Sequence, residues 1–134
     1  MKIFHFLVPG SEERKLNKVL TSNSDCIVLD IEDGIAFGSK PQARTLISKM
    51  LSTPPPSSFS SEFAVRINSI GSGFEVDDLM AILPCPNLDA ILIPKVDYPH
   101  HVHFVSRFID MYALPERFFL LFPLFLLFSC SFSF

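Results

Sequence analysis

The sequence of 134 residues predicts an α/β fold with a parallel sheet, and three observations support this class. Short apolar segments alternate four times with segments of helical periodicity. The segment at residues 26–31 is apolar on both faces, which is typical of a parallel strand covered on both sides. Three carboxylates, Asp30, Glu32 and Asp33, gather at the end of this segment beside Gly34, where α/β folds place their chemistry.

The first two pairs of strand and helix occupy the N-terminal part of the chain. Residues 3–8 predict a strand, and Ser11 is expected to cap a helix that runs to about residue 21. Residues 26–31 predict the second strand. Ser39 and Gln42 have the spacing of a capping box, so we expect the second helix to begin there.

The next two pairs follow a segment rich in proline and serine. Residues 54–61 are expected to form a loop at the end of the sheet away from the chemistry, with a linker as the alternative. Strands are predicted at residues 63–68 and 90–94, and helices at residues 76–83 and 99–112. Because no glycine-rich dinucleotide motif follows the first strand, half of a (β/α)8 barrel is favoured over a nucleotide-binding sheet.

Composition excludes some classes of partner and limits the compartment. A net charge of -3 and an isoelectric point near 5.7 provide no basic field, so nucleic acid is not an expected partner. The three cysteines have no metal-ligand spacing, which favours a reducing, intracellular compartment. Because an apolar strand is predicted almost from Met1, we expect either a cytosolic protein or a targeting prefix that lies outside this sequence. The length fits one small domain or part of a larger one.

Four ordered motifs carry a family resemblance over residues 4–117: LVPGSEERKLNK, DCIVLDIEDGIAFGSKPQAR, VRINSIGSG followed by DDL, and LDAILIPKV. Together they resemble the citrate lyase β-subunit-like family of the HpcH/HpaI aldolase superfamily. The resemblance implies a (β/α)8 barrel, usually trimeric, that uses Mg2+ to cleave or form a carbon–carbon bond of a 3-hydroxyacyl-CoA such as citramalyl-CoA or malyl-CoA. It also implies an acyl-CoA and a keto acid such as pyruvate or glyoxylate as ligands, and a mitochondrial location.

The resemblance assigns roles to several basic residues. Arg66 would hold the keto-acid carboxylate, a task that suits a bidentate guanidinium; a salt bridge to Glu32 or Asp33 is the structural alternative. Arg14 and Lys18, four residues apart on one helix face, would contact the CoA moiety. Without the resemblance, those two cations would be interpreted as part of a solvated helix face.

Three further residues are expected at the mouth of the barrel, where the carboxyl ends of the strands lie. Glu32 and Asp33 would accept hydrogen bonds from metal-bound water and orient Arg66, with a pure salt-bridge role as the alternative. Lys95 would neutralise charge on the enolate, and an ion pair with Glu32 is equally compatible with its position. Arg66, Glu32 and Asp33 are therefore the expected catalytic residues.

No metal ligand is predicted in this chain. The family's ligands are a glutamate in a motif like ETAxG and an aspartate in one like GxEDL, and neither motif occurs here. His100, His101 and His103 suggest zinc, but they lack the spacing of ligands on one helix face, so a solvated helix start is favoured.

The last segment, residues 118–134, consists of Phe, Leu, Pro, Ser and one Cys. All but Cys130 can be encoded by pyrimidines alone, so we interpret the segment as intron read-through or truncation outside the family pattern. A membrane anchor is disfavoured because the apolar run is short and contains Pro123. Residues 1–117 would then be an inactive half barrel with open edges at its first and fourth strands. A non-catalytic module that pairs with a full-length subunit is the alternative.

Overall fold

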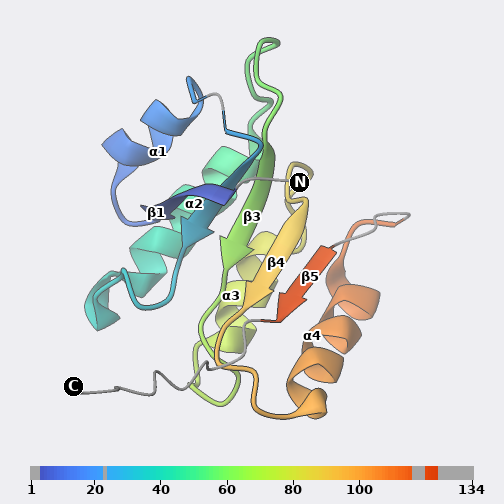
Figure 1. Ribbon diagram of the computed structural model, residues 1–134. Helices are drawn as coiled ribbons and strands as arrows, with labels where there is room; N and C mark the ends of the chain where they lie inside the picture. Colours follow the sequence, from blue (N-terminus) through green and yellow to red (C-terminus); the bar gives the residue numbers. More distant parts are fainter. Residues whose placement is uncertain (1–3, 23, 116–119, 124–134) are drawn as a thin grey trace, which may run out of the picture.

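A computed structural model describes residues 4–22, 24–115 and 120–123 of the chain. Its sheet has five parallel strands in sequence order, β1 to β5, and helices connect the first four strands (Figure 1). The elements are β1 (Phe4–Pro9), α1 (Glu13–Val19), β2 (Cys26–Asp30), α2 (Lys40–Ser52), β3 (Glu62–Arg66), α3 (Glu75–Ile82), β4 (Ala90–Ile93), α4 (Pro99–Tyr112) and β5 (Leu120–Pro123), with a 3-10 turn, Phe37–Ser39, before α2.

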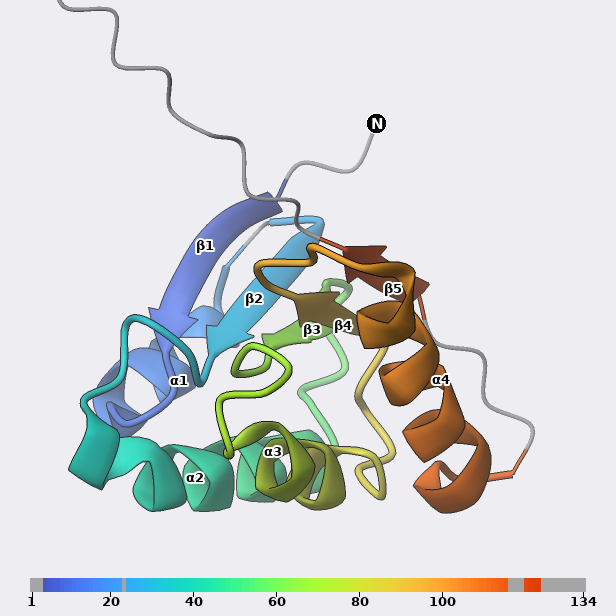
Figure 2. The same cartoon turned by 90° about the horizontal axis from the view of Figure 1, so that it is seen from below.

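The predicted parallel α/β architecture is confirmed, and it has the form of a partial barrel. The sheet does not close, because β1 and β5 are its two edges. All four helices lie on one side of the curved sheet, as Figure 2 shows. The main core lies between sheet and helices, where alternate strand residues such as Ile27, Leu29 and Val65 pack against Leu51 and Leu79. The other face carries a smaller buried cluster of short side chains: Cys26, Val28, Ala64, Ala90 and Leu92.

Two predicted helix caps are wrong. Ser11 does not cap α1, whose N-cap is Glu12 without a side-chain cap bond. Ser39 precedes α2 but makes no capping hydrogen bond either, because the preceding 3-10 turn leaves it in the helical region at φ -96° and ψ -4°. A capping side chain needs an extended backbone at that position. The element boundaries otherwise agree with prediction to within two residues, and residues 54–61 form the expected loop away from the strand carboxyl ends (Figure 1).

The fifth strand corrects the expectation that strand four has an open edge. Leu120–Pro123, within the segment interpreted as lying outside the family pattern, pairs in parallel with β4 from Ala90 to Ile93. The backbone of β5 therefore supplies hydrogen-bond partners to the backbone of β4. Residues 124–134 lie outside the described part of the chain, and the read-through interpretation stays a prediction. In the described residues, no helix is both long and apolar enough to cross a bilayer.

We expect the purified chain to self-associate. The sheet ends at β1 and β5, and exposed strand edges pair readily with other chains. Size-exclusion chromatography with light scattering should therefore show oligomers or aggregates, and thermal unfolding should lack a sharp transition. A monodisperse monomer that unfolds cooperatively would contradict this expectation and would show that the chain closes its own core.

Candidate functional site

The site begins with a pair of charges fixed by strand register. β2 and β3 are paired so that Asp30 lies directly beside Arg66, and the alternation of side chains places both on the inner face of the sheet. Arg66 donates from Nε to Asp30 Oδ1 at 2.8 Å and from Nη2 to Asp30 Oδ2 at 2.9 Å. This bidentate pair fixes the plane of the guanidinium at the carboxyl ends of the strands.

Glu32 connects this pair to a second cation. One oxygen, Oε2, lies 3.3 Å from Arg66 Nη1, and the other, Oε1, lies 2.9 Å from Lys95 Nζ. The Glu32 side chain is only 4% exposed, so both oxygens are held away from bulk water. Lys95 also lies 3.2 Å from Asp33, whose side chain is 63% exposed. Three carboxylates and two cations thus form one connected group at the mouth.

The Asp30 carboxylate also holds the turn that follows its strand. Its oxygens accept hydrogen bonds from the backbone N–H groups of Glu32 and Gly34, each at 2.9 Å. A side chain at position 34 would collide with Asp30 Oδ2, which explains the glycine there. Lys95 has a different backbone requirement: its φ of 51° lies in the left-handed region, which is uncommon for lysine. That conformation directs its side chain to Glu32 and Asp33.

These contacts shift the ionisation of the charged groups. Burial opposes ionisation of Asp30, but the Arg66 guanidinium and the N–H groups of Glu32 and Gly34 outweigh it and lower the pKa of Asp30. The hydrogen bonds to Asp30 raise the pKa of Arg66. Glu32 and then Asp33 raise the pKa of Lys95. Asp30, Arg66 and Lys95 are therefore held in their charged forms at neutral pH.

The Asp30 interaction predicts acid sensitivity. Because the pKa of Asp30 is lower in the folded chain than its ordinary value of 3.8, its stabilising contribution is present above that value and is lost as the pH falls below it. In a complete barrel that carries these residues, Asp30→Asn should lower the free energy of unfolding near neutrality by ~3 kcal/mol, because it leaves the Arg66 charge less compensated. Urea unfolding at neutral and acid pH can measure this. A difference between variant and parent that does not shrink below pH 3.8 would contradict the assignment.

Sequence reasoning missed a buried polar network behind the site. Lys40, at the start of α2, donates to the carbonyl oxygens of Ile31 and Glu32, each at 2.9 Å, and to Asn68 Oδ1 at 2.6 Å. Asn68 in turn donates to Asp78, which also accepts from Arg44 at 3.0 Å. Burial raises the pKa of Asp78. The signal was in the motifs GSKPQAR and RINS, where polar residues stand at the edge of an apolar core.

Comparison with known proteins assigns the family. A family model for HpcH/HpaI aldolase/citrate lyase matches residues 3–116. The chain belongs to the HpcH/HpaI aldolase/citrate lyase family. The human mitochondrial citramalyl-CoA lyase is 38% identical over 103 residues, which cover 75% of this chain and 30% of the relative. The (3S)-malyl-CoA thioesterase of Cereibacter sphaeroides is 35% identical over 103 residues, which cover 76% of this chain and 35% of the relative. The citrate lyase subunit beta of Leuconostoc mesenteroides is 31% identical over 96 residues, which cover 72% of this chain and 31% of the relative.

The chain thus spans about a third of the length of these members of the HpcH/HpaI family. The match covers both strands that carry the Asp30 and Arg66 pair and the strand that precedes Lys95. Of the predicted site residues, the structure brings together Arg66, Glu32, Asp33 and Lys95. Arg66 pairs mainly with Asp30, and the predicted salt bridge to Glu32 is also present, at 3.3 Å. Asp33 contacts Lys95, and no direct pair with Arg66 is present among the described residues.

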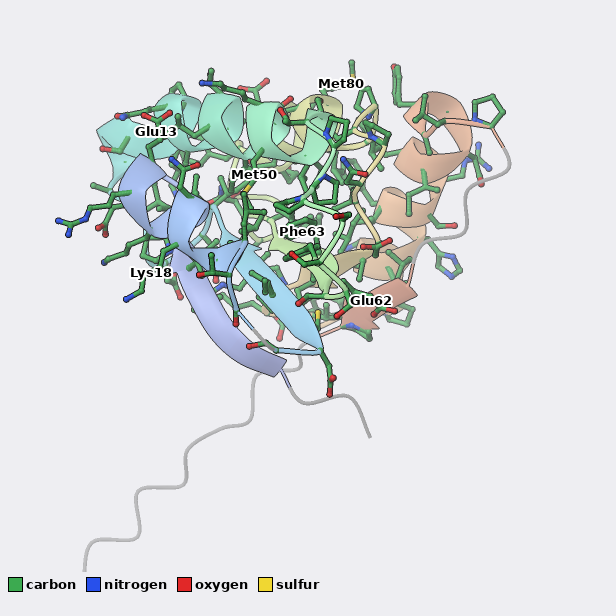
Figure 3. The ribbon with its side chains drawn as sticks, turned by 90° about the horizontal axis from the view of Figure 1, so that it is seen from above. Glu13, Lys18, Met50, Glu62, Phe63 and Met80 are labelled. Atoms are coloured by element: carbon green, nitrogen blue, oxygen red, sulfur yellow. The ribbon has the colours of Figure 1, made fainter. Side chains whose placement is uncertain are left out.

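The two residues that the family resemblance assigns to CoA lie elsewhere. Arg14 and Lys18 are exposed on α1 and, within the described ranges, contact neither Arg66 nor its carboxylates. Lys18 extends outward from α1 in Figure 3 and lines a groove of about 520 Å³ beside β1, together with Leu7, Pro9 and Thr21. The structure therefore separates these cations from the charged mouth. Their spacing on one helix face is as predicted.

Metal-binding geometry is lacking in the part of the family fold that the structure describes. Among those residues, no cluster of three or more His, Cys, Asp or Glu side chains is placed to hold an ion. Both oxygens of Asp30 and of Glu32 already face cations. The rings of His100 and His101 pack on each other and on Tyr98 at the start of α4, and His103 is exposed.

Proposed function

We propose that this chain provides the carboxylate-binding part of a carbon–carbon lyase of the aldolase type that acts on a 3-hydroxyacyl-CoA, such as citramalyl-CoA or malyl-CoA. The observation that supports this most directly is the Arg66 guanidinium, held rigidly by Asp30 at the carboxyl ends of the strands. Barrel enzymes of this architecture carry their chemistry at that face. The named activities of the human and bacterial relatives support this choice of substrate class.

Arg66 keeps donors available for a ligand. A guanidinium has five N–H groups, and the bonds to Asp30 use one on Nε and one on Nη2. The other N–H groups include the two on Nη1, which lies near Glu32. A keto-acid carboxylate could bind there as a forked acceptor. Glu32 shares its charge between Arg66 and Lys95, so it would repel an incoming anion less than an unpaired carboxylate would.

Lys95 is the more accessible cation. Its side chain is 43% exposed, against 17% for Arg66. We propose that Arg66 fixes the keto-acid end of the substrate and that Lys95 stabilises negative charge on the enolate formed as the bond breaks. Glu32, and then the exposed Asp33, raise the pKa of Lys95 and so favour its charged ammonium form. We assign these two roles separately because the guanidinium of Arg66 is planar and held in place, whereas the ammonium of Lys95 is a point charge on a flexible chain.

The Mg2+ that the resemblance implies does not fit the described residues as ligands, since Asp30 and Glu32 are engaged with cations. We propose that its ligands come from outside them, and we derive no step through it. We also propose a mitochondrial location, which the names of the human, rat and mouse relatives support, and a trimer for a complete barrel. The second candidate, a non-catalytic module that pairs with a full-length subunit, is supported by the open edge at β1.

A chimera tests the proposal. Residues 3–116 would replace the matched segment of human citramalyl-CoA lyase, which is 38% identical. We expect the chimera to cleave citramalyl-CoA or malyl-CoA and to release a keto acid, measured by reduction with NADH and lactate dehydrogenase. A chimera with the melting behaviour of the human enzyme but no turnover on either ester would reject the proposal and favour the second candidate.

In the same chimera, Arg14→Ala combined with Lys18→Ala should raise the KM for the acyl-CoA about tenfold and leave kcat nearly unchanged, because two cations contribute ~1.4 kcal/mol of uniform binding. The matched control is Lys49→Ala with Arg107→Ala, since both cations are exposed and neither lines the groove beside β1. Initial rates over a range of acyl-CoA concentration distinguish the two. An unchanged KM in the first variant would remove Arg14 and Lys18 from the binding surface.

A further inference from the structure

We propose that Lys40 is a positioning residue: its buried ammonium holds the turn at residues 30–34 so that Glu32 faces both Arg66 and Lys95. The assignment of this turn to the reaction rests on the proposed function. The positioning itself is a property of this chain. Lys40 touches none of the groups expected to contact substrate through their side chains; it acts through the backbone of the turn and through Asn68.

Lys40 connects three segments: the start of α2, the turn after β2 and the residues that follow β3. Its Nζ has three acceptors: the carbonyl oxygens of Ile31 and Glu32 at 2.9 Å and Asn68 Oδ1 at 2.6 Å. An ammonium has three N–H groups, so each has one acceptor. Lys40 as a residue is only 8% exposed, and its Nζ lies 5.5 Å from the ring centre of Phe74. None of the three acceptors is a carboxylate.

The turn is therefore held from both sides. The Asp30 carboxylate accepts from the N–H groups of Glu32 and Gly34, and Lys40 donates to the carbonyl groups of Ile31 and Glu32. The peptide groups around Glu32 thus have little freedom to rotate. Because the Glu32 side chain leaves this fixed backbone, the positions of its two oxygens against Arg66 and Lys95 depend on Lys40.

A second layer holds Lys40 itself. Asn68 directs its oxygen to Lys40 while its Nδ2 donates to Asp78 at 2.6 Å and to the carbonyl oxygen of Ile31 at 3.2 Å. Asp78 is fully buried and is compensated by Arg44 on α2, the helix that carries Lys40. Burial of an ammonium without a carboxylate partner is costly. Two of the three donors nevertheless bind the turn, and the third binds Asn68, which itself donates to Ile31 in that turn. This arrangement is better explained by positioning than by stability alone.

Chemical labelling of the full 134-residue chain tests the proposal without substrate. Lysines are acetylated with a trace of acetic anhydride and cysteines are alkylated with N-ethylmaleimide, and both are quantified by mass spectrometry. In the parent chain Lys40 should react at least about tenfold more slowly than the exposed Lys49. Equal acetylation rates for Lys40 and Lys49 would show that the Lys40 ammonium is not buried, and the proposal would then be rejected.

The variant Lys40→Met keeps the length and apolar stem of the side chain but removes the three donors. We expect the acetylation rate of Lys95 to rise about threefold or more relative to the exposed Lys15, which is present in every variant, because Lys95 is masked by Glu32 and Asp33, and Glu32 also faces Arg66. The pH profile of Lys95 labelling should shift to lower pH. Cys26 and Cys85, both buried, should stay protected. The matched control Lys49→Met, on the same helix, should leave Lys95 unchanged.

If Cys26 and Cys85 stay protected in Lys40→Met while the acetylation rate of Lys95 is unchanged, the proposal is wrong. If Lys40→Met exposes the buried thiols, Lys40→Gln, which retains two N–H donors, replaces it. Thiol exposure in both variants would show that Lys40 is needed for the fold as a whole and would reject the positioning role. In the chimera, Lys40→Met should lower kcat/KM about tenfold with the melting temperature within a few degrees of the parent. A chimera without turnover rejects the proposed function and leaves the labelling result standing.

Discussion

Arg66→Lys is expected to lower kcat/KM of the chimera about 100-fold. The guanidinium makes two hydrogen bonds to Asp30 and still has N–H groups for a ligand carboxylate, whereas an ammonium cannot do both in a fixed plane. A loss of ~3 kcal/mol is of the size expected when a charge-assisted bidentate contact is removed. The measurement is the initial rate of keto-acid release as a function of acyl-CoA concentration.

Two comparisons make this prediction specific. Arg107→Lys changes an exposed arginine on α4 and should leave kcat/KM within about twofold, because the side chain lies in solvent. Thermal unfolding of the Arg66 variant separates lost binding from lost structure. If Arg66→Lys keeps the parent's turnover in a folded chimera, Arg66 serves only the salt bridge to Asp30 and has no role toward substrate.

The 134-residue chain by itself is expected to give no detectable lyase turnover with citramalyl-CoA or malyl-CoA, with or without Mg2+. The sequence contains no motif like ETAxG or GxEDL, and the described residues contain no cluster placed to hold an ion. Asp30 and Glu32, the buried carboxylates of the site, are already engaged by Arg66 and Lys95. The expected difference from the active chimera is therefore complete loss, beyond what any single substitution would cause.

The same coupled assay serves for this test, with the chimera as the positive control and EDTA added in a parallel series. Background thioester hydrolysis is followed separately through release of free thiol. Release of a keto acid by the chain alone, dependent on Mg2+ and abolished by EDTA, would contradict the prediction. It would show that a metal site can form from this chain, either within one copy or between copies.

Much of the fold could be predicted from local sequence. The apolar period of the strands, Pro99 at the first turn of its helix and the turn residues near Gly34 each depend on residues a few positions apart, and these elements lie where predicted. The caps at Ser11 and Ser39 were wrong because capping depends on backbone angles that the neighbouring turns set. The strand at Leu120–Pro123 was missed because composition was weighed above strand propensity.

The sequence by itself determined that acids and Arg66 meet at one end of a parallel sheet, since strand order and the alternation of side chains require it. Only the tertiary structure decided which charges pair. Register puts Asp30, and neither Glu32 nor Asp33, directly beside Arg66, although the two residues are 36 positions apart. It also decided that Lys40 is buried beneath the site and that Lys95 adopts a left-handed backbone. Such partners depend on distances across the sheet and between layers, which periodicity along one strand does not encode.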